Sequence, residues 1–241
     1  MQTMQVIEMT AAGEPDVLML AQRPVPEISR PSQVRVRMKA AGVNPIDTKL
    51  RRNGTFFPKN LPAVLGMDGA GVVDEVGSQV SEFAPGDEVY FCCNGLGREP
   101  GTYAEFVLVE AHALARKPAN LSFTEAAAVP LVLITAWEAL HDRVALGDGQ
   151  QILIHAGAGG VGHIAIQLAR LAGARIATTV STDSKAELVR ELGAGKVILY
   201  RDQNVVEETL EWTGGRGADV VMDNVGGKLF EQSFPAVRVY G

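Results

Sequence analysis

Apolar residues follow two different patterns along the chain, and the change between them lies near residue 122. From about Ser122 onward, short unbroken apolar runs alternate with segments in which apolar residues recur every three or four positions. The first pattern fits buried strands of a parallel sheet, and the second fits amphipathic helices. The expected strands are "QQILIH", "ARIATTV", "KVILY" and "ADVVMDNVGG". This alternation predicts a doubly wound parallel sheet. A complete sheet of this kind has about six strands, so we expect a partial one, with the edge of a fifth strand at the terminal "RVYG".

The first half of the chain has short strand-like runs separated by Gly, Pro and Asn. These runs are "QVRVRMKAAGV", "GAGVVDEVG", "DEVYFC" and "YAEFVLVE", and their short spacing predicts a β-rich barrel. Between the halves, Ser122 or Thr124 with Glu125 gives a signal for the start of a helix, and Pro130 should divide the Ala-rich run into two helical pieces. We therefore expect one domain over residues 1–122 and a second over 123–241.

The stretch "HAGAGGVGHIAIQLARLAGA" joins the first two strands of the predicted sheet. Gly157, Gly159 and Gly162 match the G-x-G-x-x-G pattern between a strand and a helix. In that setting the glycines permit a tight turn, close approach of a pyrophosphate and close packing of helix on strand. The free N–H groups of the helix N-terminus then face the phosphates. The alternative is a tight turn without a ligand, but the complete strand, turn, helix and strand favour a dinucleotide.

The end of the second strand indicates which dinucleotide is bound. NAD sites usually carry Asp or Glu about 20 residues past the glycines, where this chain has Val180 and Ser181. Ser181 and Lys185 could instead bind a 2′-phosphate, so the sequence predicts NADP(H). The carboxylate of Asp183 would repel a 2′-phosphate if it turned inward. Lys185 could also be simply a solvated residue in the first turn of the next helix.

Composition narrows the class of protein. The chain has 241 residues, of which 46% are hydrophobic and 21% charged, and its net charge is −6. An acidic chain disfavours a broad nucleic-acid surface. The adjacent Cys92 and Cys93 are the only cysteines, which suits a reducing compartment. No apolar run reaches transmembrane length and the N-terminus does not resemble a secretory signal, so we expect a cytoplasmic protein with no membrane contact.

Several long motifs, in order, resemble the medium-chain dehydrogenase/reductases, in particular their zinc-independent quinone oxidoreductase (zeta-crystallin-like) branch. They are "AAGVNPIDTKLRRNG", "PAVLGMDGAGVVDEVG", "PGDEVYF", "GTYAEFVLV", "HAGAGGVGHIAIQLAR", "ELGAGKVILYR" and "DVVMDNVGG". The resemblance implies a GroES-like barrel followed by a Rossmann domain. Family chains then return to the barrel, so it also implies that the Rossmann domain is incomplete here, through truncation at the C-terminus.

The family resemblance also allows a test for zinc. Zinc-dependent members carry G-x-C-x-x-D and G-H-E, whereas this chain reads "GVNPID" from Gly42 and "GMD" from Gly66. Asn44 and Met67 thus replace the Cys and His ligands, and neither an amide nor a thioether is a usual zinc donor. We expect no metal. Without a Lewis acid, the expected reaction is hydride transfer from NADPH to a quinone or an α,β-unsaturated carbonyl.

The resemblance assigns roles to individual residues. It places Asn44 and Asp47 beside the nicotinamide and the substrate, although a turn at Asn44 and a helix cap by Asp47 are equally good interpretations. Many relatives carry tyrosines at the two positions where this chain has Lys49 and Phe57. Lys49 could serve as a proton donor in place of the missing tyrosine. Expected cofactor contacts are Thr135, Gly157, Gly159, Gly160, Val161, Gly162, Ser181, Lys185, Tyr200, Asn224 and Val225. His155 is interpreted as a core residue, and Thr135 and Tyr200 could also be purely structural.

Two other functions compete with a reductase. Some relatives bind single-stranded RNA, so the chain could be a non-catalytic nucleotide-binding or RNA-binding protein, although its acidic charge opposes this. It could also be a folded but inactive remnant. Full-length relatives are expected to form homodimers through the last strand of the Rossmann sheet, and the oligomeric state of this form stays open.

Overall fold

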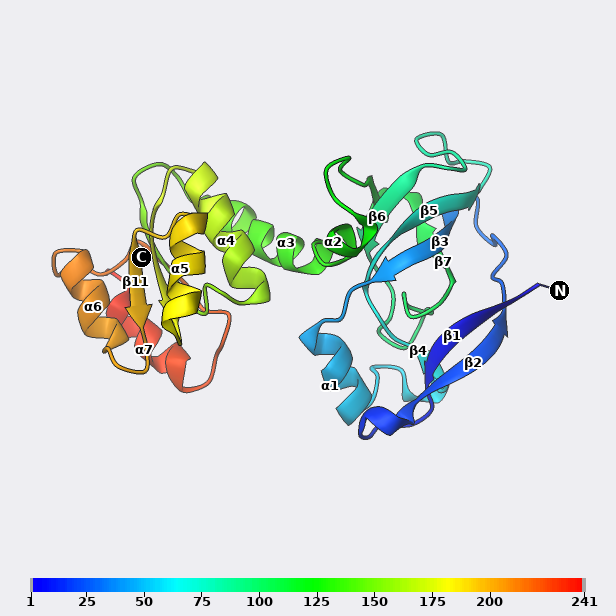
Figure 1. Cartoon of the computed structure of the whole chain (residues 1–241), viewed down its shortest axis with the longest axis horizontal. Coiled ribbons are helices and arrows are strands. Elements are labelled where there is room, and N and C mark those ends of the chain that lie inside the picture. The colour runs from blue at the N-terminus through cyan, green and yellow to red at the C-terminus, as the bar shows by residue number, and fades with distance from the viewer. Residues whose placement is uncertain (1, 240–241) are drawn as a thin grey trace. The chain divides into compact units, whose positions relative to one another are not determined.

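The computed structural model describes residues 2–239, which form two compact units that divide between Leu131 and Val132 (Figure 1). The boundary expected after residue 122 precedes helix α2 (Phe123–Ala127). This helix buries Ala126 and Ala127 against Ala70 of the first unit, so by packing it belongs with the residues before it. The expected domain boundary itself stays a prediction.

The first unit contains two antiparallel sheets. The three-stranded sheet has the order β2 (Leu18–Pro24), β1 (Thr3–Met9), β4 (Ala63–Val64). The five-stranded sheet has the order β7 (Phe106–Glu110), β3 (Gln33–Ala41), β5 (Asp68–Val76), β6 (Glu88–Cys92), β8 (Leu114–Arg116). Alternate residues of the large sheet, such as Val34, Val36, Val107 and Val109, form its buried core. Helix α1 (Pro45–Asn53) follows β3.

The chain leaves the first unit through two helical pieces, as Pro130 predicted. Ser122 is the N-cap of helix α2, and its side chain accepts a hydrogen bond from the Glu125 N–H. Helix α3 (Pro130–Trp137) begins at the proline itself, where the missing N–H is tolerated. A π-helical turn over Glu138–Arg143 continues it, and the sequence pattern gave no indication of that turn.

The second unit is the predicted parallel sheet, with the order β11 (Lys196–Leu199), β10 (Arg175–Val180), β9 (Gln151–Ile154), β12 (Val220–Met222). The helices are α4 (Gly160–Leu171), α5 (Asp183–Leu192), α6 (Val205–Trp212) and α7 (Lys228–Ala236). Val237, just before the expected fifth strand, makes a single parallel bridge to Ala218, and residues 240 and 241 of that expected strand lie outside the described residues. No helix within residues 2–239 combines the length and the apolar character needed to span a membrane.

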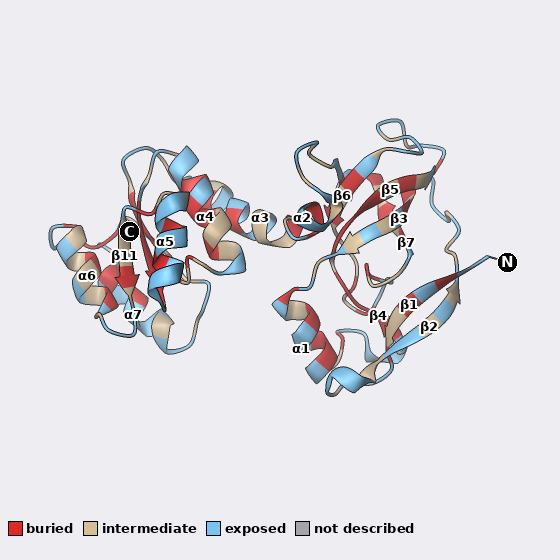
Figure 2. Ribbon diagram, in the orientation of Figure 1, coloured by how far each residue is buried: buried red, intermediate tan, exposed pale blue. Residues whose placement is uncertain are grey.

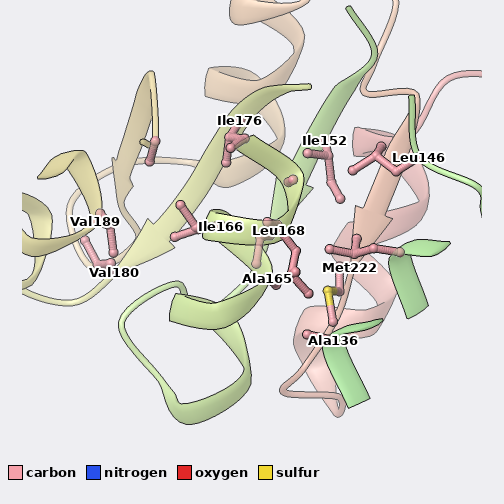
Figure 3. Packing of buried hydrophobic residues seen from close by; sticks show 14 of the residues in the cluster. Ala136, Leu146, Ile152, Ala165, Ile166, Leu168, Ile176, Val180, Val189 and Met222 are labelled. Carbon is pink, nitrogen blue, oxygen red and sulfur yellow. The ribbon is translucent and has the colours of Figure 1, made fainter. Parts of the chain in front are cut away.

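Both faces of this parallel sheet are covered. Ile152 and Ile176 pack with Ile166 of α4 on one face (Figure 3), and Leu153 and Ala177, the next residues along the same strands, pack toward α6 and α7 on the other. The central strands β9 and β10 are therefore buried between helices (Figure 2). Because the carboxyl ends of parallel strands meet at one edge, the loops after β9, β10, β11 and β12 lie along that edge, where such sheets bind ligands.

Candidate functional site

The glycine turn after β9 is held against the end of the neighbouring strand. Ala156 adopts a positive φ of 53°, which reverses the chain. Its N–H donates to Oγ1 of Thr179 across 3.0 Å, and the Gly157 N–H donates to the Thr179 carbonyl across 3.1 Å. The start of the turn is thus fixed by β10 before any ligand binds.

The three glycines of the turn differ in what the protein itself requires. A Cβ on Gly157 would lie 2.0 Å from Oγ1 of Thr178, and one on Gly162 would lie 2.2 Å from the Ala156 carbonyl oxygen. Packing alone therefore demands glycine at both positions. A Cβ on Gly159 would meet the same carbonyl oxygen at 3.1 Å, which is a much smaller conflict. Gly159 is the position where close approach by a ligand best accounts for the absence of a side chain.

Helix α4 begins directly at this turn, with Gly159 as its N-cap and no side chain capping it. The first N–H groups of a helix, here including those of Gly160, Val161 and Gly162, have no partner within the helix. The Val161 side chain packs against the core. Val161 therefore contributes its backbone N–H, and not its side chain, to the start of the helix. Uncapped N–H groups and the helix dipole make this end suitable for a phosphate.

The structure brings the predicted 2′-phosphate residues together. Nζ of Lys185 lies 3.4 Å from Oγ of Ser181, and the Tyr200 N–H donates to the Val180 carbonyl across 3.2 Å. Lys185 is exposed in the first turn of α5, so the interpretation as a solvated residue also stays open. Asp183 is the first residue of the same helix, where a carboxylate complements the helix dipole.

The loop after β12 lies against the base of the glycine turn. Nδ2 of Asn224 donates to the His155 carbonyl across 3.2 Å, and Val225 is exposed. His155 is fully buried, with Nδ1 3.4 Å from Oγ1 of Thr179 and Nε2 3.3 Å from Oγ of Ser233. Burial lowers its pKa, against the opposing charge of Asp223. The interpretation of His155 as a core histidine is confirmed.

Thr135 is exposed on α3, and its expected contact with the cofactor stays a prediction. Lys49 is exposed on α1 and Phe57 is partly exposed after it. The proton-donor role expected of Lys49 stays a prediction.

The second group of predicted residues lies at the start of α1 in the first unit. Oδ2 of Asp47 accepts the Asn44 backbone N–H across 2.8 Å, while the Asp47 N–H donates to the Asn44 carbonyl across 3.0 Å. The expected helix cap is therefore present, and both side chains are buried. The Asn44 side chain also reaches another element. Its Nδ2 donates to Oδ2 of Asp68 across 2.9 Å.

Sequence reasoning missed two members of this buried group, Asp68 and Tyr103. The Tyr103 hydroxyl donates to Oδ2 of Asp47 across 3.1 Å. Burial raises the pKa of Asp47, opposed by hydrogen bonds from Asn44, Tyr103 and Gly66. Burial likewise raises the pKa of Asp68, opposed by donors on Asn44, Cys92 and Leu131. The sequence signal for Asp68 is its place in the "GMD" motif, next to the position of the lost zinc ligand.

The donors around Asn44 do not fit zinc. The Asn44 amide points a hydrogen, not a lone pair, at Asp68, and Met67 supplies only a thioether. Within residues 2–239, no group of three or more His, Cys, Asp or Glu side chains could hold a metal ion. The expected absence of a metal stays a prediction, and no chemical step here requires one.

Family models match both units. Residues 30–119 match the alcohol dehydrogenase GroES-like domain, and residues 160–241 match a domain described as zinc-binding dehydrogenase. A quinone oxidoreductase of Pseudomonas aeruginosa is 39% identical over 98% of this chain and 70% of its own length. The 2-haloacrylate reductase of a Burkholderia species is 39% identical over 88% of this chain and 63% of its own length.

Solved structures show the same similarity. An alcohol dehydrogenase superfamily protein from Novosphingobium aromaticivorans matches with a TM-score of 0.91 and 42% identity, covering 99% of this chain and 71% of that one. The Escherichia coli quinone oxidoreductase complexed with NADPH matches with a TM-score of 0.85 and 37% identity, covering 97% and 70%. The expected combination of a GroES-like part and a Rossmann-like sheet is confirmed.

Proposed function

The chain belongs to the medium-chain dehydrogenase/reductase family, and from this premise we propose that it reduces a quinone or an α,β-unsaturated carbonyl with NADPH, by hydride transfer without a metal. The relatives named as quinone oxidoreductase and 2-haloacrylate reductase support this choice of acceptor. Both acceptor types are electrophilic before they bind, so neither depends on a Lewis acid.

The observation that carries the proposal is the edge of the parallel sheet in the second unit. The uncapped start of α4 suits the pyrophosphate, and the Lys185–Ser181 pair suits the 2′-phosphate. No carboxylate stands at Ser181, where an NAD-binding chain usually has one for the ribose hydroxyls. Tyr200 would then lie beside the adenosine, and Asn224, Val225 and Thr135 would contact the rest of the cofactor.

We assign different tasks to the residues in the first unit. When bound, NADPH supplies the hydride. Asn44 would donate its second amide hydrogen to an oxygen of the acceptor, because the first is held by Asp68. Asp47 accepts from Asn44 and Tyr103, so its task is to fix Asn44. Lys49, exposed on the same helix, is the candidate source of the proton that completes the reduction.

Three further features are part of the proposal. A small-molecule acceptor follows from the reductase function, and a cytoplasmic location fits the acidic chain with its reduced, adjacent cysteines. A homodimer is proposed for full-length relatives. RNA binding is the competing function, and the net charge of −6 opposes it.

The test is turnover with a matched pair of acceptors. NADPH oxidation is followed with a benzoquinone and with an enone, and with the saturated ketone that corresponds to the enone as the control. We expect turnover with the first two and none with the ketone. Saturable NADPH binding without turnover on any acceptor would contradict the reductase function and favour a nucleotide-binding protein.

A further inference from the structure

Asp68 collects hydrogen bonds from elements that are far apart in the sequence. It is the first residue of β5, and its side chain is 1% exposed. Oδ2 accepts from Nδ2 of Asn44 across 2.9 Å, and Oδ1 accepts from the backbone N–H of Leu131 across 3.0 Å. The thiol of Cys92 is a further donor to this carboxylate. Burial and the charge of Asp68 raise the pKa of Cys92, which keeps the sulfur protonated as a donor.

The first consequence concerns the orientation of Asn44. Its backbone is fixed by the Asp47 carboxylate at the start of α1, and its amide is fixed by the Asp68 carboxylate from β5. An amide has two N–H donors and one carbonyl acceptor. A carboxylate partner selects the NH₂ end, so the Asp68 contact decides which end of the Asn44 amide faces β5 and which groups remain for another partner.

The second consequence concerns helix α3. Pro130 opens the helix and has no N–H, so Leu131 carries the first backbone donor in it. A helix N-terminus of this kind is stabilised by a negatively charged acceptor, and Asp68 supplies one from another element. The same carboxylate therefore also fixes the first turn of the helix that carries Thr135.

We propose that Asp68 is a positioning residue, a single buried carboxylate that fixes both the Asn44 amide and the first turn of α3. The proposal rests on the reductase function proposed above. Asp68 need not touch the acceptor or the cofactor, and acts through Asn44 and Leu131. An asparagine at position 68 cannot replace the carboxylate, although it has the same shape. Its NH₂ group would face either the Asn44 amide or the Leu131 N–H, and both of these are donors.

A double-mutant cycle tests the part that acts through Asn44. Asp68→Asn is made in the wild-type chain and in Asn44→Ala, and kcat, KM, the dissociation constant of NADPH and the melting temperature are measured. In the wild-type background we expect kcat to fall about 10-fold to 100-fold, because small misplacement of a substrate-contacting group has effects of this size. In the Asn44→Ala background the same change should lower kcat by a clearly smaller factor, because one of the two groups that Asp68 positions is gone and only the contact with the first turn of α3 remains to be lost.

Two control variants make the outcomes distinguishable. Asp74→Asn removes a carboxylate from the same strand, where it pairs with Arg35 and Arg37, and should leave kcat unchanged. Asp68→Glu keeps the charge and both oxygens, and should retain more activity than Asp68→Asn. If Asp68→Asn does not fold, the cycle is run with Asp68→Glu.

An equal fall in kcat in both backgrounds would overturn the positioning of Asn44 by Asp68, and no fall in a folded wild-type background would overturn the positioning role altogether. The reductase function stands in either case. A wild-type chain that binds NADPH but reduces no acceptor would instead overturn the reductase function, and the positioning proposal with it.

Discussion

The Tyr103 hydroxyl donates a hydrogen bond to Oδ2 of Asp47 across 3.1 Å, although 56 positions separate the two residues. The bond joins the loop before β7 to the start of α1, and the same oxygen also accepts the Asn44 N–H. The Tyr103 hydroxyl and the Asn44 N–H thus donate hydrogen bonds to one oxygen of a buried carboxylate. The candidate substrate residue Asn44 depends on this arrangement for its backbone position.

Removing the hydroxyl with Tyr103→Phe leaves Asp47 with one donor fewer. We expect a loss of about 1–2 kcal/mol in the free energy of unfolding at pH 7, because a buried acceptor loses a partner. Urea unfolding measures it. Tyr90→Phe on β6 is the control, with an expected change below about 0.5 kcal/mol. Equal effects of the two substitutions would contradict the bond.

Asp47 also predicts a pH dependence. Burial raises its pKa above the ordinary 3.8. Between 3.8 and the raised value, the folded chain binds the proton and the unfolded chain does not, so this group makes the protein less stable as the pH rises through that window. Asp47→Asn removes the effect.

Asp47→Asn should therefore be less stable than wild type by the largest amount at acidic pH, and this deficit in the free energy of unfolding should shrink toward neutral pH. Chemical denaturation of both proteins across pH 4–8 measures the difference, and titrations shared by the two proteins cancel in it. A difference that does not change with pH would show that the pKa of Asp47 is not raised.

The glycine turn allows packing to be separated from ligand binding. Gly157→Ala and Gly162→Ala should each destabilise the protein by about 1–3 kcal/mol, because their Cβ atoms would lie 2.0 and 2.2 Å from existing atoms. Gly159→Ala should change the stability little, since its nearest contact would be 3.1 Å, but should weaken NADPH binding at least tenfold. Calorimetry and titration of the three variants test this. Unchanged NADPH affinity in Gly159→Ala would contradict the prediction that the pyrophosphate binds at this turn.

The parallel sheet could be predicted almost completely from the sequence, because each of its elements carries a local signal. Apolar runs mark β9 and β10, helical spacing marks α4, and Gly193 follows the end of α5 with a positive φ of 122°, which favours glycine. Ser181 and Lys185 could be predicted together for a similar reason, since they stand only four positions apart where β10 passes into α5.

The buried group in the first unit could not be predicted in this way. Asn44 meets Asp68 across 24 positions and Leu131 meets Asp68 across 63, and no periodicity specifies which polar residues of different elements will pair. Asn44 and Asp47 were identified only through the family motif. Asp68 lies in a different family motif, "PAVLGMDGAGVVDEVG", in which the functional signal is the neighbouring position of the lost zinc ligand, so its role as an acceptor carries no signal of its own.

The preference for NADPH over NADH tests the central claim most directly. Dissociation constants for both cofactors are measured with wild type, Lys185→Ala and Arg190→Ala, which removes a positive charge from the far end of the same helix. Lys185→Ala should weaken NADPH binding at least tenfold, about 1.4 kcal/mol, while NADH binding changes less than about twofold and Arg190→Ala has little effect on either. Equal losses for the two cofactors in Lys185→Ala, or a wild type that prefers NADH, would contradict the account.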